Sequence, residues 1–114
     1  LKELFADAYQ KMAAWSREEE LTFLHRILPR YADQAMVLTL GAVTAEKLTD
    51  QDCQDLIEAY PQLQLAKETL AQEAGFILSF GKVDASYLYR DLVDAVREEQ
   101  SFHMAASIFK EEKN

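Results

Sequence analysis

Residues that interrupt helices are scarce in this chain, and their scarcity limits the fold more than any motif does. Only three glycines and two prolines occur among 114 residues. Ala, Leu, Glu and Gln, which have high intrinsic helix propensity, are abundant by contrast. We identify no stretch with the alternating period of a half-buried strand. The sequence therefore predicts an all-α protein.

The length of the chain indicates one domain. A chain of 114 residues can close one hydrophobic core and leaves no room for a second of ordinary size. Hydrophobic residues make up 49% of it, which excludes a disordered chain. We expect a single domain over residues 1–114, built as a compact bundle of five to six helices. The sequence starts at Leu1 instead of Met, which leaves open whether the N-terminus is complete.

The first half of the chain has clear helical periodicity. Residues 1–15 place apolar side chains at i, i+3, i+4 and i+7, which predicts an amphipathic helix. Ser16 and Glu19 have the spacing of a capping box, so a second helix should start there and end near Pro29. Residues 31–43 are apolar on every side and predict a central helix ending at Gly41. A short strand over residues 37–40 is the alternative.

The second half suggests further helices separated by turn residues. Thr49 should cap a helix over residues 50–60, and Pro61 marks the next corner. Residues 62–80 keep apolar side chains in helical register and predict one helix that runs through Gly75 and stops at Gly81. Asp84 should cap the last long helix, and a short helix is expected over residues 102–109.

The segment 46–58 is strongly acidic. Its five acids are opposed there only by Lys47, and they are Glu46, Asp50, Asp52, Asp55 and Glu58. At about 100° per residue, a helix over 50–60 turns one apolar face inward. That face comprises Cys53, Leu56, Ile57 and Tyr60, whereas Asp52, Asp55 and Glu58 lie opposite. We therefore expect an outward acidic face.

Charge and cysteine content exclude several classes of partner and setting. The net charge is −8, which disfavours nucleic acid and anionic membrane surfaces. The longest uncharged apolar stretch, residues 34–45, is too short to span a bilayer, which needs about 20 residues. A single cysteine cannot form an internal disulfide, and the sequence contains no signal-peptide pattern. These observations predict a cytoplasmic protein.

One alternative reading is an enzyme. Two pairs of acids with i, i+3 spacing, Asp52 with Asp55 and Asp91 with Asp94, would hold Mg²⁺ if their helices faced one another. That arrangement would suit a metal-dependent helical nucleotide phosphohydrolase. An EF-hand is excluded by Pro61 at its twelfth position. The two histidines, His25 and His103, lack metal-ligand spacing, and we expect no catalytic set, no metal and no cofactor.

A second alternative reading is a DNA-binding regulator. Residues 69–92 resemble a helix-turn-helix, with Ala71 and Gly75 at the spacing used between the first helix and the turn. The apolar anchor expected six residues later is missing, because Gly81 occupies that position. Acids outnumber bases in this segment, which would oppose binding to phosphates.

A second apolar set favours a binding function. Leu65, Phe76 and Phe80 lie on the side of the predicted 62–80 helix that faces away from its main stripe. Either a neighbouring segment covers them, or they form a homodimer or partner surface. We therefore expect a small acidic helical protein that acts by protein–protein interaction, as an adaptor, inhibitor or regulatory factor. Its acidic face, Asp52, Asp55 and Glu58, would attract a basic protein partner.

Overall fold

The chain folds as an α/β protein, and the prediction of an all-α bundle is wrong. The computed structural model describes residues 2–98, with side chains from residue 6 onward. Its elements are α1 (Lys2–Ala13), α2 (Arg17–Ile27), the 3₁₀ turn η1 (Leu28–Tyr31), β1 (Met36–Leu40), α3 (Ala42–Ala45), α4 (Asp50–Ala59), β2 (Leu63–Leu65), β3 (Gly75–Phe80) and β4 (Val83–Leu88). Residues 89–98 form a further helix, here called the terminal helix. The short helix expected over 102–109 lies outside the described residues.

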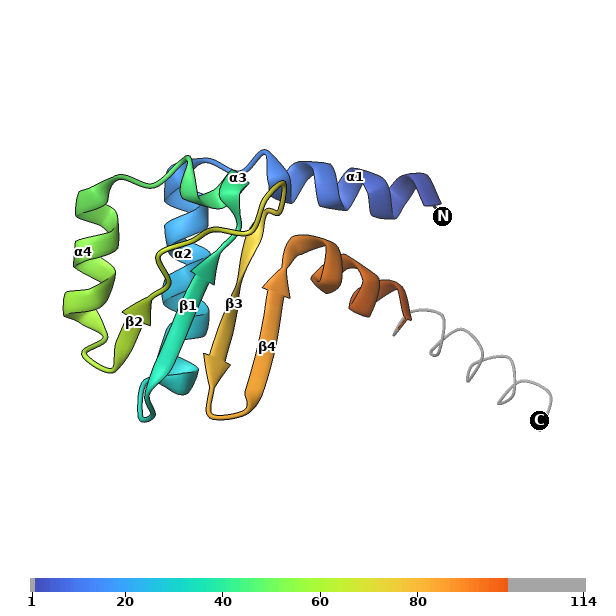
Figure 1. Cartoon of the computed structure of the whole chain (residues 1–114). Coiled ribbons are helices and arrows are strands. Elements are labelled where there is room, and N and C mark those ends of the chain that lie inside the picture. The colour runs from blue at the N-terminus through green and yellow to red at the C-terminus, as the bar shows by residue number, and fades with distance from the viewer. Residues whose placement is uncertain (1, 99–114) are drawn as a thin grey trace, which may run out of the picture.

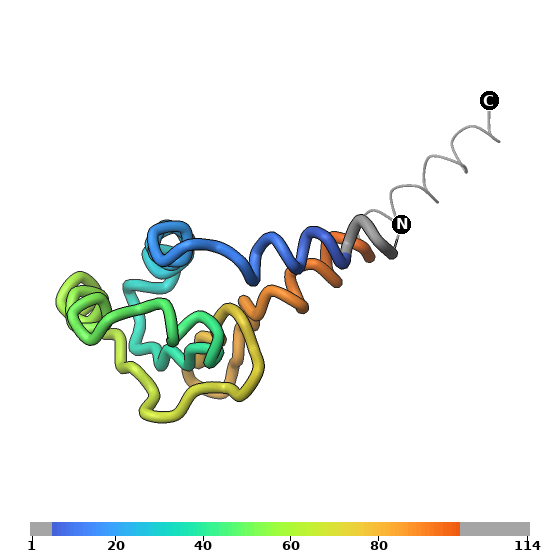
Figure 2. The backbone as a smooth tube through the Cα atoms, turned by 90° about the horizontal axis from the view of Figure 1, so that it is seen from above, coloured from blue at the N-terminus to red at the C-terminus, as the bar shows by residue number. Residues whose placement is uncertain are grey.

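The four strands form one mixed sheet in the order β2-β1-β3-β4. β1 runs parallel to β2, and both the β1–β3 and β3–β4 pairs are antiparallel. The parallel pair requires a crossover, which α3 and α4 supply, whereas β3 and β4 are joined by a tight turn at Gly81. In Figure 1, α2 and α4 lie beside the left half of the sheet, and Figure 2 shows both helices on the same side of it.

The strands follow a period of two that the helical reading overlooked. In β1, Met36, Leu38 and Leu40 are buried while Val37 and Thr39 are half-buried. The same alternation governs β2 and β3, whose inward residues are Leu63, Leu65, Phe76, Leu78 and Phe80. Side chains alternate between the faces of a strand, so one face meets the helices. The strand over residues 37–40, kept as an alternative, is confirmed, and the helix predicted over 62–80 is wrong. The last long helix starts at Tyr89 and not at Asp84, because residues 83–88 form β4.

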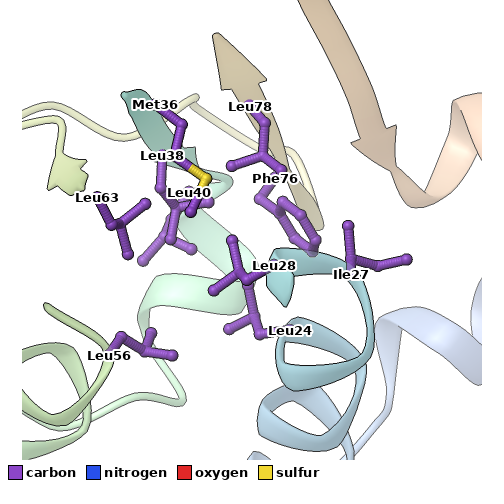
Figure 3. Packing of buried hydrophobic residues seen from close by; sticks show 10 residues of the cluster. All are labelled: Leu24, Ile27, Leu28, Met36, Leu38, Leu40, Leu56, Leu63, Phe76 and Leu78. Atoms are coloured by element: carbon purple, nitrogen blue, oxygen red, sulfur yellow. The ribbon is translucent and has the colours of Figure 1, made fainter. Parts of the chain in front are cut away.

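The hydrophobic core lies between the sheet and the helices α2 and α4. Ten buried side chains form it, as Figure 3 shows: Leu24, Ile27, Leu28, Met36, Leu38, Leu40, Leu56, Leu63, Phe76 and Leu78. Leu28, Leu38 and Leu78 have no exposed surface. Burial of these apolar surfaces is the main favourable contribution to folding, because it removes them from water. The core thus fixes which side of α4 faces outward.

The helices predicted to start at Ser16 and at Thr49 are confirmed. Ser16 Oγ accepts from the Glu19 amide at 3.2 Å, and Glu19 Oε1 accepts from the Ser16 amide at 3.1 Å. This reciprocal pair starts α2, which ends at Ile27 before Pro29. Thr49 caps α4 in the same way. None of the described helices combines the length and apolar character that a membrane span requires.

Two glycines allow backbone segments to approach closely. A side chain at Gly41 would place its Cβ 2.3 Å from the carbonyl oxygen of Glu73. Gly75 has a φ of 106°, which other residues rarely adopt, and its Cβ would lie 2.4 Å from the Tyr87 carbonyl oxygen. Gly41 therefore marks a close backbone contact, whereas Gly75 begins a strand instead of lying within a helix.

Replacing Gly41 by alanine should destabilise the protein by about 1–3 kcal/mol, because the added methyl group must displace backbone atoms. The backbone at Gly41 has a φ of −68°, which alanine adopts freely, so the loss would come from the clash alone. Urea denaturation should show a lower midpoint with an unchanged slope. An unchanged midpoint would contradict the close packing of residues 41 and 73.

Candidate protein-binding surface

Helix α4 carries most of the acidic segment, and its start is built by side chains. Thr49 Oγ1 accepts from the Asp52 amide at 3.0 Å, and Asp52 Oδ2 accepts from the Thr49 amide at 2.9 Å. Acids in the first turn also stabilise the positive end of the helix dipole. Leu56 then anchors the inner side of α4 in the core with 1% of its surface exposed. The capping role of Asp52 therefore turns its carboxylate back toward the body.

Asp52 faces inward and is paired, which corrects its expected place on the outer face. Its two carboxylate oxygens accept from Arg17, Oδ2 from Nε at 2.7 Å and Oδ1 from Nη2 at 2.5 Å. Only 4% of the Asp52 side chain is exposed, against 49% of the Arg17 side chain. The hydrogen bond from Arg17, followed by that from the Thr49 amide, holds the pKa of Asp52 well below its usual range. Arg17 was not singled out in the sequence because it lies 35 residues away.

Replacing Arg17 by methionine should lower stability at neutral pH and change the acid response. A carboxyl group whose pKa is depressed by folding stabilises the protein above its unfolded pKa of about 3.9, and this stabilisation is lost as the pH falls below it. In the variant, the pKa of Asp52 in the folded state is lowered much less. The difference in melting temperature between the variant and the wild type should therefore be largest at pH 7. The two melting curves should converge as the pH is lowered below about 4.

Arg26→Met provides the matched control, since Arg26 is exposed on the same helix and forms no ion pair with any other described residue. Its melting temperature should follow that of the wild type at every pH. A constant gap between Arg17→Met and the wild type down to pH 2 would contradict the assigned role of the Asp52 carboxylate.

The outer side of α4 retains three exposed carboxylates, those of Asp50, Asp55 and Glu58. None of the three takes part in an ion pair within the described part of the chain. Among the described residues, Asp55 Oδ1 accepts only from Gln51 Nε2 of the same helix, at 2.8 Å. Ile57 was expected to face the core but is 37% exposed, and it lies about two turns after Asp50. This side of α4 is therefore acidic with one accessible apolar side chain.

The predicted apolar set does not form one surface. Phe76 is in the core with 1% of its surface exposed. Leu65 and Phe80 are half-buried against the same core, and the Phe80 ring stacks on Tyr31 at a centroid distance of 5.1 Å. The helix that would have grouped the three residues is absent, because they occupy β2 and β3. Elements of the same chain cover most of these side chains, as one of the two readings held.

The two acidic pairs considered as metal ligands are not brought together. Asp52 is bound by Arg17, while Asp91 accepts from Ser86 Oγ at 2.5 Å and Asp94 lies 3.5 Å from Arg97. In Figure 1, α4 and the terminal helix lie at opposite ends of the molecule. Within residues 6–98, no three His, Cys, Asp or Glu side chains cluster as metal ligands would. The four-carboxylate arrangement is therefore not assembled.

The segment that resembled a helix-turn-helix has a different structure. Residues 75–88 form the hairpin of β3 and β4, so no pair of helices spans 69–92. His25 is exposed and its Nδ1 lies 2.8 Å from the Tyr60 hydroxyl, whereas His103 lies outside the described residues. Burial, together with Asp50 and Asp52, raises the pKa of the Cys53 thiol. The thiol is therefore held in its less reactive protonated form.

One buried charged group was overlooked in the sequence. Glu20 of α2 is 1% exposed and accepts from the Tyr89 hydroxyl at 2.6 Å and from Lys47 Nζ at 3.3 Å. The available signal was its register, because Glu20 precedes Leu24 and Ile27 by four and seven positions and so shares their buried face.

Comparison with known proteins identifies no relative. No protein-family description, no curated protein and no solved structure matches the chain. The assignment of a function therefore depends on the geometry of the described residues.

Proposed function

We propose that the protein is a small protein-binding module, acting as an adaptor, inhibitor or regulatory factor, and that it docks through the outer side of α4. One observation supports this most. Asp50, Asp55 and Glu58 are exposed together there without an ion-pair partner among the described residues, beside the accessible side chain of Ile57. The inward acid of the same helix, Asp52, is by contrast neutralised by Arg17.

The partner should present basic side chains around an apolar contact. Carboxylates without an ion-pair partner attract a positively charged surface over a distance of about 10 Å at 0.1 M salt, and this attraction accelerates association. Ile57 would supply apolar area at the edge of the contact, and the acids would supply orientation and specificity. We include a cytoplasmic location in the proposal, which suits the single, half-buried Cys53.

Reversing two charges on α4 should remove the partner from an affinity capture. Asp55→Lys with Glu58→Lys changes exposed side chains only, so the fold should be retained. Asp33→Lys with Asp84→Lys is the matched control, because it changes the net charge equally at exposed positions outside α4. Extracts of the source cell should be passed over wild-type, α4-reversed and control baits, and the captured proteins identified by mass spectrometry.

The expected result is a protein captured by the wild-type and control baits and depleted on the α4-reversed bait. If every specifically captured protein were retained equally by the α4-reversed bait, the outer side of α4 would not be the binding surface. Equal depletion on both reversed baits would indicate an effect of net charge alone and would also contradict the proposal.

A further inference from the structure

The strongest unassigned feature is a buried polar cluster at the point where two helices leave the body. α1 and the terminal helix both project from the same end of the molecule, as Figures 1 and 2 show. The cluster comprises Glu20, Lys47 and Tyr89 together with the carbonyl group of Ala13, the last residue of α1. Its members come from α1, from α2, from the residues after α3 and from the start of the terminal helix.

One carboxylate joins these segments. Glu20 Oε2 accepts from the Tyr89 hydroxyl at 2.6 Å, and Tyr89 is the first residue of the terminal helix. Glu20 Oε1 accepts from Lys47 Nζ at 3.3 Å, and the same Nζ donates to the Ala13 carbonyl oxygen at 2.8 Å. The Glu20 side chain has no exposed surface, whereas 23% of the Lys47 side chain is exposed. A buried charge is costly unless it is paired, so Glu20 strongly favours the arrangement that keeps both partners in place.

Contacts around the buried cluster also hold α1 and the terminal helix in place. The Trp15 ring, in the short connection between α1 and α2, meets the Tyr89 ring edge-on at a centroid distance of 5.2 Å. The Tyr89 amide donates to the Ala74 carbonyl oxygen at 2.9 Å, which ties the start of the terminal helix to the body. Burial, with the hydrogen bond to Glu20, raises the pKa of Tyr89, so its hydroxyl remains a donor.

We propose that Glu20, Lys47 and Tyr89 form a latch that fixes the directions of α1 and the terminal helix together. Lys47 holds the end of α1, Tyr89 holds the start of the terminal helix, and Glu20 binds both. Releasing either partner leaves the buried carboxylate incompletely satisfied, so loosening of one helix loosens the other. The latch is a conformational device that couples the two helices, and it stands independently of the binding role proposed for α4.

Distances between spin labels test this coupling in the 114-residue chain. Labels on cysteines introduced at Asp7, Gln54 and Glu98, all exposed, would report on α1, the body and the terminal helix in a Cys53→Ala background. Electron–electron double resonance should give one narrow distance distribution for each of the pairs 7–54 and 54–98. Lys47→Met removes the contact with α1, and Tyr89→Phe removes only the hydroxyl that contacts Glu20.

Both substitutions should abolish the single narrow peak for both label pairs. Lys67→Met, an exposed lysine in the loop after β2, is the matched control and should leave both peaks unchanged. Far-ultraviolet circular dichroism and a melting curve would establish that each variant is folded, and Tyr89→Phe replaces Lys47→Met if the latter does not fold. Unchanged distributions in a folded variant would refute the latch. Broadening of one label pair alone would refute the coupling, because the helices would then be held independently.

Discussion

Replacing Phe76 by alanine is expected to lower the free energy of unfolding by about 3–5 kcal/mol, because a large buried ring would leave a cavity. Phe76 is 1% exposed, and its ring stacks on Tyr87 at a centroid distance of 5.3 Å and contacts Phe23 at 5.7 Å. The expected loss is a large share of the 5–15 kcal/mol that stabilises an ordinary domain. Urea denaturation followed by circular dichroism would measure it as a lower midpoint.

Val83→Ala is the control for this substitution, since Val83 lies in the neighbouring strand β4 with 54% of its surface exposed. Its midpoint should change by an amount corresponding to about 0.5 kcal/mol or less. The comparison also separates two readings of Phe76. A residue that served a partner surface would tolerate alanine in the free protein, so a small loss would contradict its place in the core.

Replacing Glu20 by leucine is expected to destabilise the protein by about 3 kcal/mol, because it leaves a buried hydroxyl without its acceptor and an ammonium group without its carboxylate partner. The Tyr89 hydroxyl, in a fully buried residue, would lose its acceptor. Lys47 keeps 23% exposure, so water would partly compensate it, and the expected loss therefore lies at the lower end of that for a broken buried pair. Thermal and urea denaturation would both report the change.

Glu18→Leu tests whether the loss comes from burial and not from the exchange of an acid for leucine in this helix. Glu18 is exposed in the first turn of α2, so its replacement should cost only the small favourable interaction with the helix dipole, about 0.3–1 kcal/mol. Equal losses at positions 18 and 20 would contradict the importance assigned to the buried cluster.

The helices that could be predicted from the sequence are those that local contacts determine. The capping boxes of Ser16 with Glu19 and of Thr49 with Asp52 are formed by residues three positions apart, so their signal lies within one window of sequence. The strands depend instead on pairing between distant segments. Met36 of β1 lies opposite Leu63 of β2, and nothing in either short apolar run identifies the other.

The 62–80 segment combines a helical pattern with a strand pattern. Leu63, Ala66 and Leu70 have helical spacing, but the alternation of Phe76, Leu78 and Phe80 with Ile77 and Ser79 is that of a strand. Tertiary pairing of β3 with both β1 and β4 decided the outcome over local propensity. A glycine with positive φ at position 75 then separates the strand from the preceding loop.

The acidic surface was predictable only in part. Helical periodicity placed Asp55 and Glu58 outward and Leu56 inward, as the structure has them. It failed for Asp52, because the cap geometry and Arg17 draw that carboxylate toward the body, and for Ile57, which lies at the edge of the buried side. Helical periodicity takes no account of a distant cation or of the shape of the neighbouring sheet. Both determine which side chains are exposed to a partner.

The claim that the outer side of α4 binds a basic partner is tested most directly by the association rate of the captured protein. Stopped-flow measurements should compare the wild type, Asp55→Lys with Glu58→Lys, and the control Asp33→Lys with Asp84→Lys at low and high salt. We predict that the α4-reversed variant associates much more slowly than the control at low salt and that this difference shrinks as salt screens the charges. Identical rates for the α4-reversed variant and the control at both salt concentrations would contradict the claim.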